Sequence, residues 1–151
     1  MINLSKHFTL SEFIKSPTAT RLGIDNTPGP DEFRNLQALV DNVLEPLRVH
    51  YGRPIIITSG YRCPQLNKAV GGSSTSQHAH GQAADIRSIS DKRDDNKELF
   101  DMIREMGLPY DQLINEFNYD WIHVSFSPRN RRQVLEAVKN TSGKTVYKKI
   151  L

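Results

Sequence analysis

Apolar residues recur every three or four positions between residues 33 and 47, the spacing that lines one face of a helix. The apolar positions are Phe33, Leu36, Leu39, Val40, Val43, Leu44 and Leu47. Pro30 suits the first turn of this helix, Pro46 should kink it near its end, and Gly52 can cap it. The pattern predicts one long amphipathic helix with a buried stripe.

Short runs rich in β-branched and apolar residues predict strands. The expected strands are Pro54–Thr58, Gln82–Ser88, Leu113–Phe117 and Trp121–Phe126. Helices are expected at Pro64–Ala69 and Asp94–Met106. The tail, Gln133–Leu151, could form a helix or a strand followed by a hairpin at Asn140–Gly143. Without a repeat, linker or shift in composition, residues 1–151 should form a single α+β domain, a small antiparallel sheet flanked by helices, with the motif-bearing core at about 30–127.

Composition narrows the class of protein. The chain of 151 residues is 37% hydrophobic and 25% charged, and it lacks the long apolar run of a membrane span, so membrane insertion is not expected. The first residues, Met1–His7, contain no apolar segment typical of a secretion signal. The lone Cys63 excludes an internal disulfide and a cysteine-rich zinc site. A net charge of +3 is mildly basic and suits an anionic polymer such as a bacterial wall; no nucleic-acid partner is expected, and the chain should be a monomer.

Candidate chemistry is concentrated in two motifs. Residues 76–85 have the form S-x-H-x-x-G-x-A-x-D, and residues 120–123 read D-W-I-H. His78, Asp85 and His123 supply two imidazoles and a carboxylate, which can hold one zinc ion and leave a fourth position for water, as in catalytic zinc sites. His80 could replace His78 as the first ligand, because residues two apart can face the same way; otherwise it should contact the substrate.

Metal-assisted hydrolysis also needs a base and a group that stabilises the oxyanion. Asp120 can accept a proton from the attacking water and pass it to the leaving amine. It lies three residues before His123, so it reaches the site only if the strand begins or bends there. Glu116 is the alternative base. Arg62, at a turn after a strand, can stabilise the oxyanion or pair with a substrate carboxylate.

These motifs resemble the M15 family of zinc D-alanyl-D-alanine peptidases, and in particular its phage and prophage branch. The segments Phe8–Phe13, Leu36–Leu47 and Ile57–Arg62 resemble that branch in order and spacing, so the similarity covers about residues 5–127. The resemblance implies the Hedgehog/DD-peptidase α+β fold and one zinc ion per chain. On that pattern His78, Asp85 and His123 correspond to the zinc ligands, Asp120 to the catalytic carboxylate, Arg62 to the arginine that polarises the carbonyl, and Ser76 to a substrate-binding serine.

The resemblance further implies hydrolysis of a peptide bond in the bacterial peptidoglycan stem, by an endopeptidase or a D-Ala-D-Ala carboxypeptidase. The partners would be stem peptides. We expect the protein to be synthesised in the cytoplasm without a signal peptide and to reach the wall by holin-type release or virion delivery. The protein could instead take part in wall remodelling. The alternative is a non-catalytic, zinc-containing module that binds the wall or a virion, which would need neither Asp120 nor Arg62.

Overall fold

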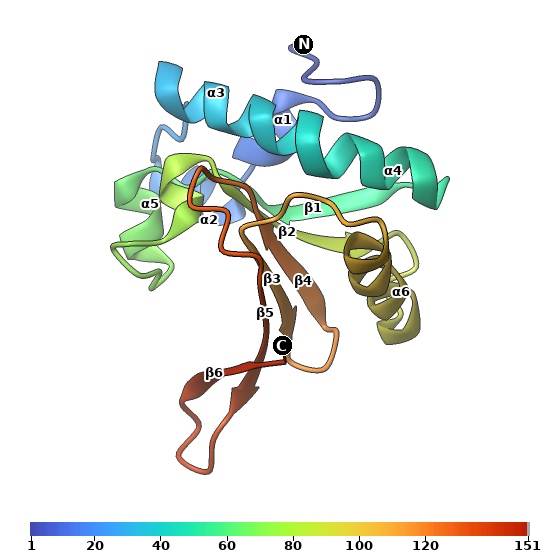
Figure 1. The fold of residues 1–151 in the computed structure, drawn as a ribbon. Coiled ribbons are helices and arrows are strands. Elements are labelled where there is room, and N and C mark those ends of the chain that lie inside the picture. Colours follow the sequence, from blue (N-terminus) through green and yellow to red (C-terminus); the bar gives the residue numbers. More distant parts are fainter. Residues whose placement is uncertain (151) are drawn as a thin grey trace.

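A computed structural model describes residues 1–150 and places one six-stranded sheet at the centre of the molecule (Figure 1). The sheet has the order β1-β2-β4-β3-β5-β6, and its neighbouring strands are antiparallel except for β3 and β5. The strands are β1 (Ile55–Ser59), β2 (Ala83–Ser88), β3 (Gln112–Glu116), β4 (Trp121–Ser125), β5 (Gln133–Lys139) and β6 (Thr145–Lys149). The predicted α+β architecture is confirmed, and the tail forms a hairpin of two strands.

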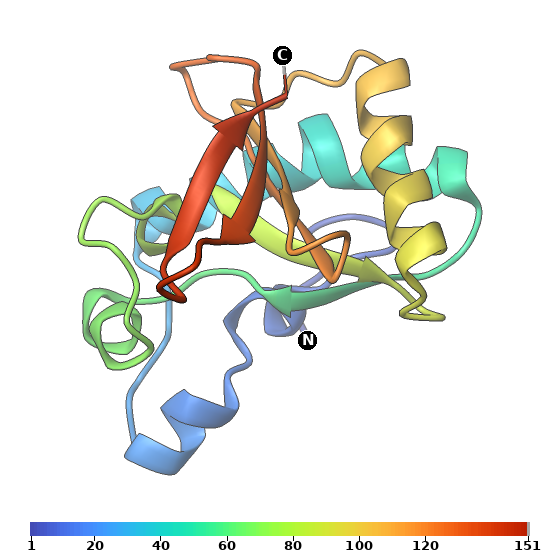
Figure 2. The ribbon, with the colours of Figure 1, turned by 90° about the horizontal axis from the view of Figure 1, so that it is seen from below.

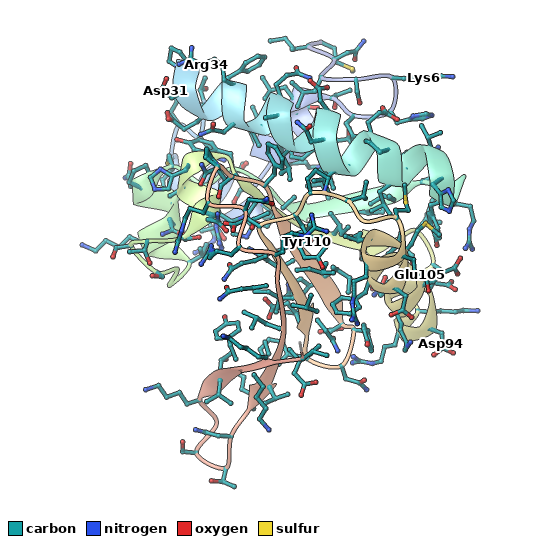
Figure 3. All side chains as sticks on the ribbon, viewed as in Figure 1. Lys6, Asp31, Arg34, Asp94, Glu105 and Tyr110 are labelled. Carbon is teal, nitrogen blue, oxygen red and sulfur yellow. The ribbon has the colours of Figure 1, made fainter. Side chains whose placement is uncertain are left out.

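Helices flank this sheet, as expected. They are α1 (Leu10–Ile14), α2 (Pro17–Leu22), α3 (Pro30–Leu39), α4 (Glu45–Tyr51), α5 (Pro64–Ala69) and α6 (Arg93–Glu105), with a 3₁₀ turn, η2 (Gln77–His80). Helix α6 packs against β2, β3 and β4, and its acidic residues Asp94 and Glu105 point outward, away from the sheet (Figure 3). Among residues 1–150, no helix is both long enough and apolar enough to cross a bilayer.

The long helix predicted from Pro30 is present, and Pro46 changes its winding. Proline has no N–H, and its ring collides with the carbonyl four residues earlier in a regular helix. Ahead of it, residues 40–44 form a π-helical segment, η1 (Val40–Leu44), in which the Glu45 N–H donates to the Val40 carbonyl. A wider turn therefore joins α3 to α4 and keeps the apolar stripe against the core.

Apolar and polar side chains alternate along β2 and β4, so the sheet has one apolar face and one polar face there. Ile86, Ile122 and Val124 are fully buried on the face that packs against the helices. The residues between them, Asp85 and His123, point to the opposite face. Burial of the first set therefore determines which polar groups meet on the second.

Asp111 joins three segments of the chain through its side chain. Its fully buried carboxylate accepts hydrogen bonds from the Arg131 guanidinium at 2.9 and 3.0 Å, from the Ser127 hydroxyl at 2.9 Å and from the Gln77 amide at 2.8 Å. Burial alone would raise the pKa of Asp111, but these donors, with Arg131 first, hold it well below the ordinary carboxyl value. Asp111 thus ties η2 and the β4–β5 loop to the start of β3.

Substituting Asp111→Asn should lower the free energy of unfolding by about 3 kcal/mol at pH 7, because it leaves a largely buried Arg131 charge uncompensated. A carboxyl whose folded-state pKa is depressed stabilises the protein above its unfolded pKa of about 4, and that stabilisation is lost as the pH falls further. Urea unfolding of the metal-free protein checks both statements. Asp101→Asn, on the exposed side of α6, is the control; equal stability of the two variants would contradict the prediction.

Candidate metal centre

Two candidate ligands face each other across neighbouring strands. In the β2–β4 pair Asp85 lies directly opposite His123, and Asp85 Oδ1 is 3.1 Å from His123 Nδ1. Directly opposed residues of an antiparallel pair project from the same face, so the contact follows from the strand register.

His78 reaches the same carboxylate from η2. The Ser76 hydroxyl accepts the His78 backbone N–H at 3.2 Å and so caps this turn. Gly81 ends the turn at a φ of 70°, and a Cβ there would lie 2.5 Å from the Glu32 carbonyl oxygen, so only glycine fits. The motif glycine is therefore needed to bring His78 to the sheet.

The ring orientation of His78 is determined by its backbone partner. Its Nδ1 lies 2.7 Å from the Gly60 carbonyl oxygen, which can only accept, so Nδ1 carries the proton. The other ring nitrogen, Nε2, then faces Asp85 Oδ1 at 3.4 Å. A carbonyl that fixes the tautomer in this way is a common support for a metal-binding histidine.

A cavity of about 900 Å³ opens over this cluster. Its wall includes Arg62, Ser76 and Glu116 together with the three candidate ligands. Arg62 leaves β1 at the predicted turn, and its Nε is buried without a hydrogen-bond partner in the described part of the chain. The cavity thus holds an unused cationic donor close to the candidate ligands.

Glu116 is the carboxyl that β3 adds to this wall. It lies two residues beyond Ile114, the direct partner of His123, and therefore faces the same side of the sheet. Only 7% of it is exposed. Burial and the nearby Asp85 charge raise the pKa of Glu116 to about 7, although His123 opposes the shift. A carboxyl that titrates near neutrality inside a cavity is suited to proton transfer.

An unusual turn follows Glu116. Phe117, Asn118 and Tyr119 all have a positive φ, between 53° and 62°, which is rare for residues other than glycine. Arg93 of α6 donates to the Phe117 and Asn118 carbonyls at 2.9 and 2.8 Å, and Asn96 donates to the Tyr119 carbonyl at 3.0 Å. Contacts from α6 therefore hold the turn that ends β3 at Glu116.

The same turn directs Asp120 elsewhere. Its side chain is 54% exposed, lies 3.7 Å from Arg93 and is absent from the cavity wall among residues 1–150. His80 is also exposed and outside that wall; its carbonyl accepts from Asn35. Of the residues singled out from the sequence, the structure brings together His78, Asp85, His123, Arg62 and Ser76, and it does not bring Asp120 or His80 to them.

A model of the family described as Peptidase M15 matches residues 6–125. The chain belongs to the peptidase M15 family. Membership implies a metallopeptidase hydrolase. No curated protein matches the chain significantly. The family match ends at Ser125 of β4, so β5 and β6 of this M15 protein lie beyond it.

The ligand cluster of the M15 domain fits a metal ion. One donor atom from each of His78, Asp85 and His123 lies within 4.8 Å of the others. Burial would raise the pKa of Asp85, but the two imidazoles, with His78 first, lower it below its ordinary value, so the carboxylate is ionised. Two nitrogens and one oxygen form a donor set that zinc accepts.

We expect metal analysis of the protein purified without chelator to give close to one zinc ion per chain. Replacing His78, Asp85 or His123 by alanine should remove most of it, because two ligands hold zinc far more weakly than three. His80→Ala is the matched control, since His80 is an exposed imidazole two residues from His78. Stoichiometric zinc in the first three variants, or its loss in His80→Ala alone, would contradict the assignment.

Proposed function

We propose that this M15 protein is a zinc-dependent peptidase that hydrolyses a peptide bond of the bacterial peptidoglycan stem. The observation that carries the proposal is the buried carboxyl of Glu116, which lines the same cavity as the cluster of His78, Asp85 and His123. The stem-peptide substrate is supported by the resemblance of the motifs to D-alanyl-D-alanine peptidases.

Five residues of the cavity have roles in this chemistry: His78, Asp85, His123, Glu116 and Arg62. Zinc, when held by the three ligands, would act as a Lewis acid and make a water molecule more acidic. Glu116 accepts the proton of the attacking water, and the protonated carboxyl then delivers it to the leaving amine. Arg62 donates to the carbonyl oxygen as negative charge develops on it. We therefore propose Glu116, rather than Asp120, as the general base.

A module that only binds the wall is the competing function. Such a module could use the zinc cluster for structure, but it gains nothing from a carboxyl kept out of water. Burying Glu116 costs free energy, because desolvation disfavours its charged form. A buried acid and an unused guanidinium that line the same cavity form the pattern expected of a catalytic site.

We further propose that the protein acts in phage-type lysis and cuts as an endopeptidase. The phage setting is supported by the segments Phe8–Phe13 and Ile57–Arg62, which resemble the phage and prophage branch. Lysis requires the wall to be opened, so cleavage within a stem or crosslink serves it better than removal of a terminal D-Ala. Delivery through a holin or with a virion would bring the protein to this substrate.

Glu116→Gln should lower kcat by about 10²–10⁴-fold, because it removes the base while keeping its shape. The zinc content should stay at that of the wild type, since Glu116 is not among the three clustered ligands. Asp120→Asn is the matched control and should stay close to wild-type activity, since this carboxylate faces Arg93. If Asp120→Asn loses turnover and Glu116→Gln keeps it, the base is misassigned.

Digestion of purified sacculi, followed by mass spectrometry of the new termini, tests the reaction itself. An endopeptidase should release a new amino terminus within the stem or crosslink, and Glu116→Gln protein should release none above background. Free D-Ala as the sole product would show a carboxypeptidase. If sacculi and stem peptides remain intact after incubation with zinc-loaded wild-type protein, the function is that of a wall-binding module.

A further inference from the structure

The hairpin of β5 and β6 completes the cavity wall although it lies beyond the family match. Figure 1 shows it extending from the part of the sheet farthest from α3, and in Figure 2 it stands in front of the other strands. Leu135, Lys139, Thr145 and Tyr147 of this hairpin line the cavity. Substrate bound in this cavity can therefore contact the hairpin.

Strand register brings Tyr147 into line with the proposed base. Glu116 pairs with Ala137 across β3 and β5, and Ala137 pairs with Tyr147 across β5 and β6, so the three side chains share a face. The small Ala137 leaves room between the two larger groups. Tyr147 is 58% exposed, and its hydroxyl is a donor at neutral pH; the remaining burial, with the charges of Glu116 and Asp85, raises its pKa further.

The floor of this part of the cavity is apolar. Ile114, Leu135 and Ala137 form a small buried cluster with Phe117 packed against it, separate from the main core. Methylene groups placed on this floor would lose contact with water, which is favourable.

Lys139 places a positive charge at one end of this apolar floor. Lys139 faces the same side as Ala137; its Nζ donates to the Thr145 hydroxyl at 3.0 Å and lies 5.4 Å from the centre of the Phe117 ring. No carboxylate pairs with it in the described part of the chain. The acidic groups of the cavity wall are Asp85 and Glu116, and neither pairs with Lys139, so its ammonium group can bind an incoming carboxylate.

We propose that the hairpin is a substrate-selecting subsite for an acidic group of the peptide, with methylene groups on the apolar floor and the carboxylate bound by Lys139 Nζ and the Tyr147 hydroxyl. This inference rests on the proposed function, because it identifies which peptides the same cavity accepts. Peptidoglycan stems present such groups, since a γ-linked D-glutamate and a diaminopimelate each keep a carboxylate beside methylene groups.

The test compares the peptide L-Ala-γ-D-Glu-meso-diaminopimelate-D-Ala with versions in which each carboxylate in turn is a carboxamide. For zinc-loaded wild type, one amidation should lower kcat/KM by about tenfold, the effect of one charge-assisted hydrogen bond. In Lys139→Gln the same amidation should have little effect, because the cation is gone. Lys148→Gln is the matched control: it removes an equal charge from the opposite face of the same hairpin and should keep the wild-type discrimination.

Calorimetric binding of the same peptides to zinc-loaded Glu116→Gln protein separates this inference from the proposed reaction. If binding distinguishes the amidated from the unamidated peptide only when Lys139 is present, and wild type cleaves neither, the reaction is overturned and the subsite is supported. If wild type cleaves the peptides but every amidation has the same effect in wild type and in Lys139→Gln, the subsite is overturned and the reaction stands. Absence of both binding and cleavage would overturn both.

Discussion

Asp85 and His123 project from the same face of neighbouring strands only because β2 and β4 pair in one particular register. A shift by one residue would turn one of the two toward the helices and separate the ligands. The alternate residues Ile86, Ile122 and Val124, all fully buried, resist that shift because it would expose them. The hydrophobic core therefore determines the geometry of the candidate metal centre.

The third ligand depends on loop geometry instead. His78 is placed by Gly81, which alone fits against the Glu32 carbonyl, and its ring is oriented by Gly60. Asp111 secures the same turn through Gln77 and also anchors the β4–β5 loop through Arg131. One ionised carboxylate thus links the motif that carries His78 to the loop that leads into the hairpin.

The strands, the α+β class and the metal cluster could be predicted from the sequence because each depends on local alternation or on motif spacing. The location of Asp120 could not be predicted. Whether its carboxylate enters the cavity depends on the left-handed turn at Phe117–Tyr119, which contains no glycine and is held by Arg93 of α6. Glu116 and His123, in contrast, both face the cavity, a relation that becomes visible only once β3 and β4 are known to pair. The pattern left the start of the tail open between helix and strand, because the strand β5 depends on pairing with β3.

Anomalous diffraction at the zinc absorption edge, from crystals of the zinc-loaded protein, tests the metal centre most directly. We expect one peak about 2.0–2.2 Å from His78 Nε2, His123 Nδ1 and an oxygen of Asp85, with the hydrogen bond from His78 to the Gly60 carbonyl retained. A peak bound through His80, or one that lacks Asp85 as a ligand, would contradict it.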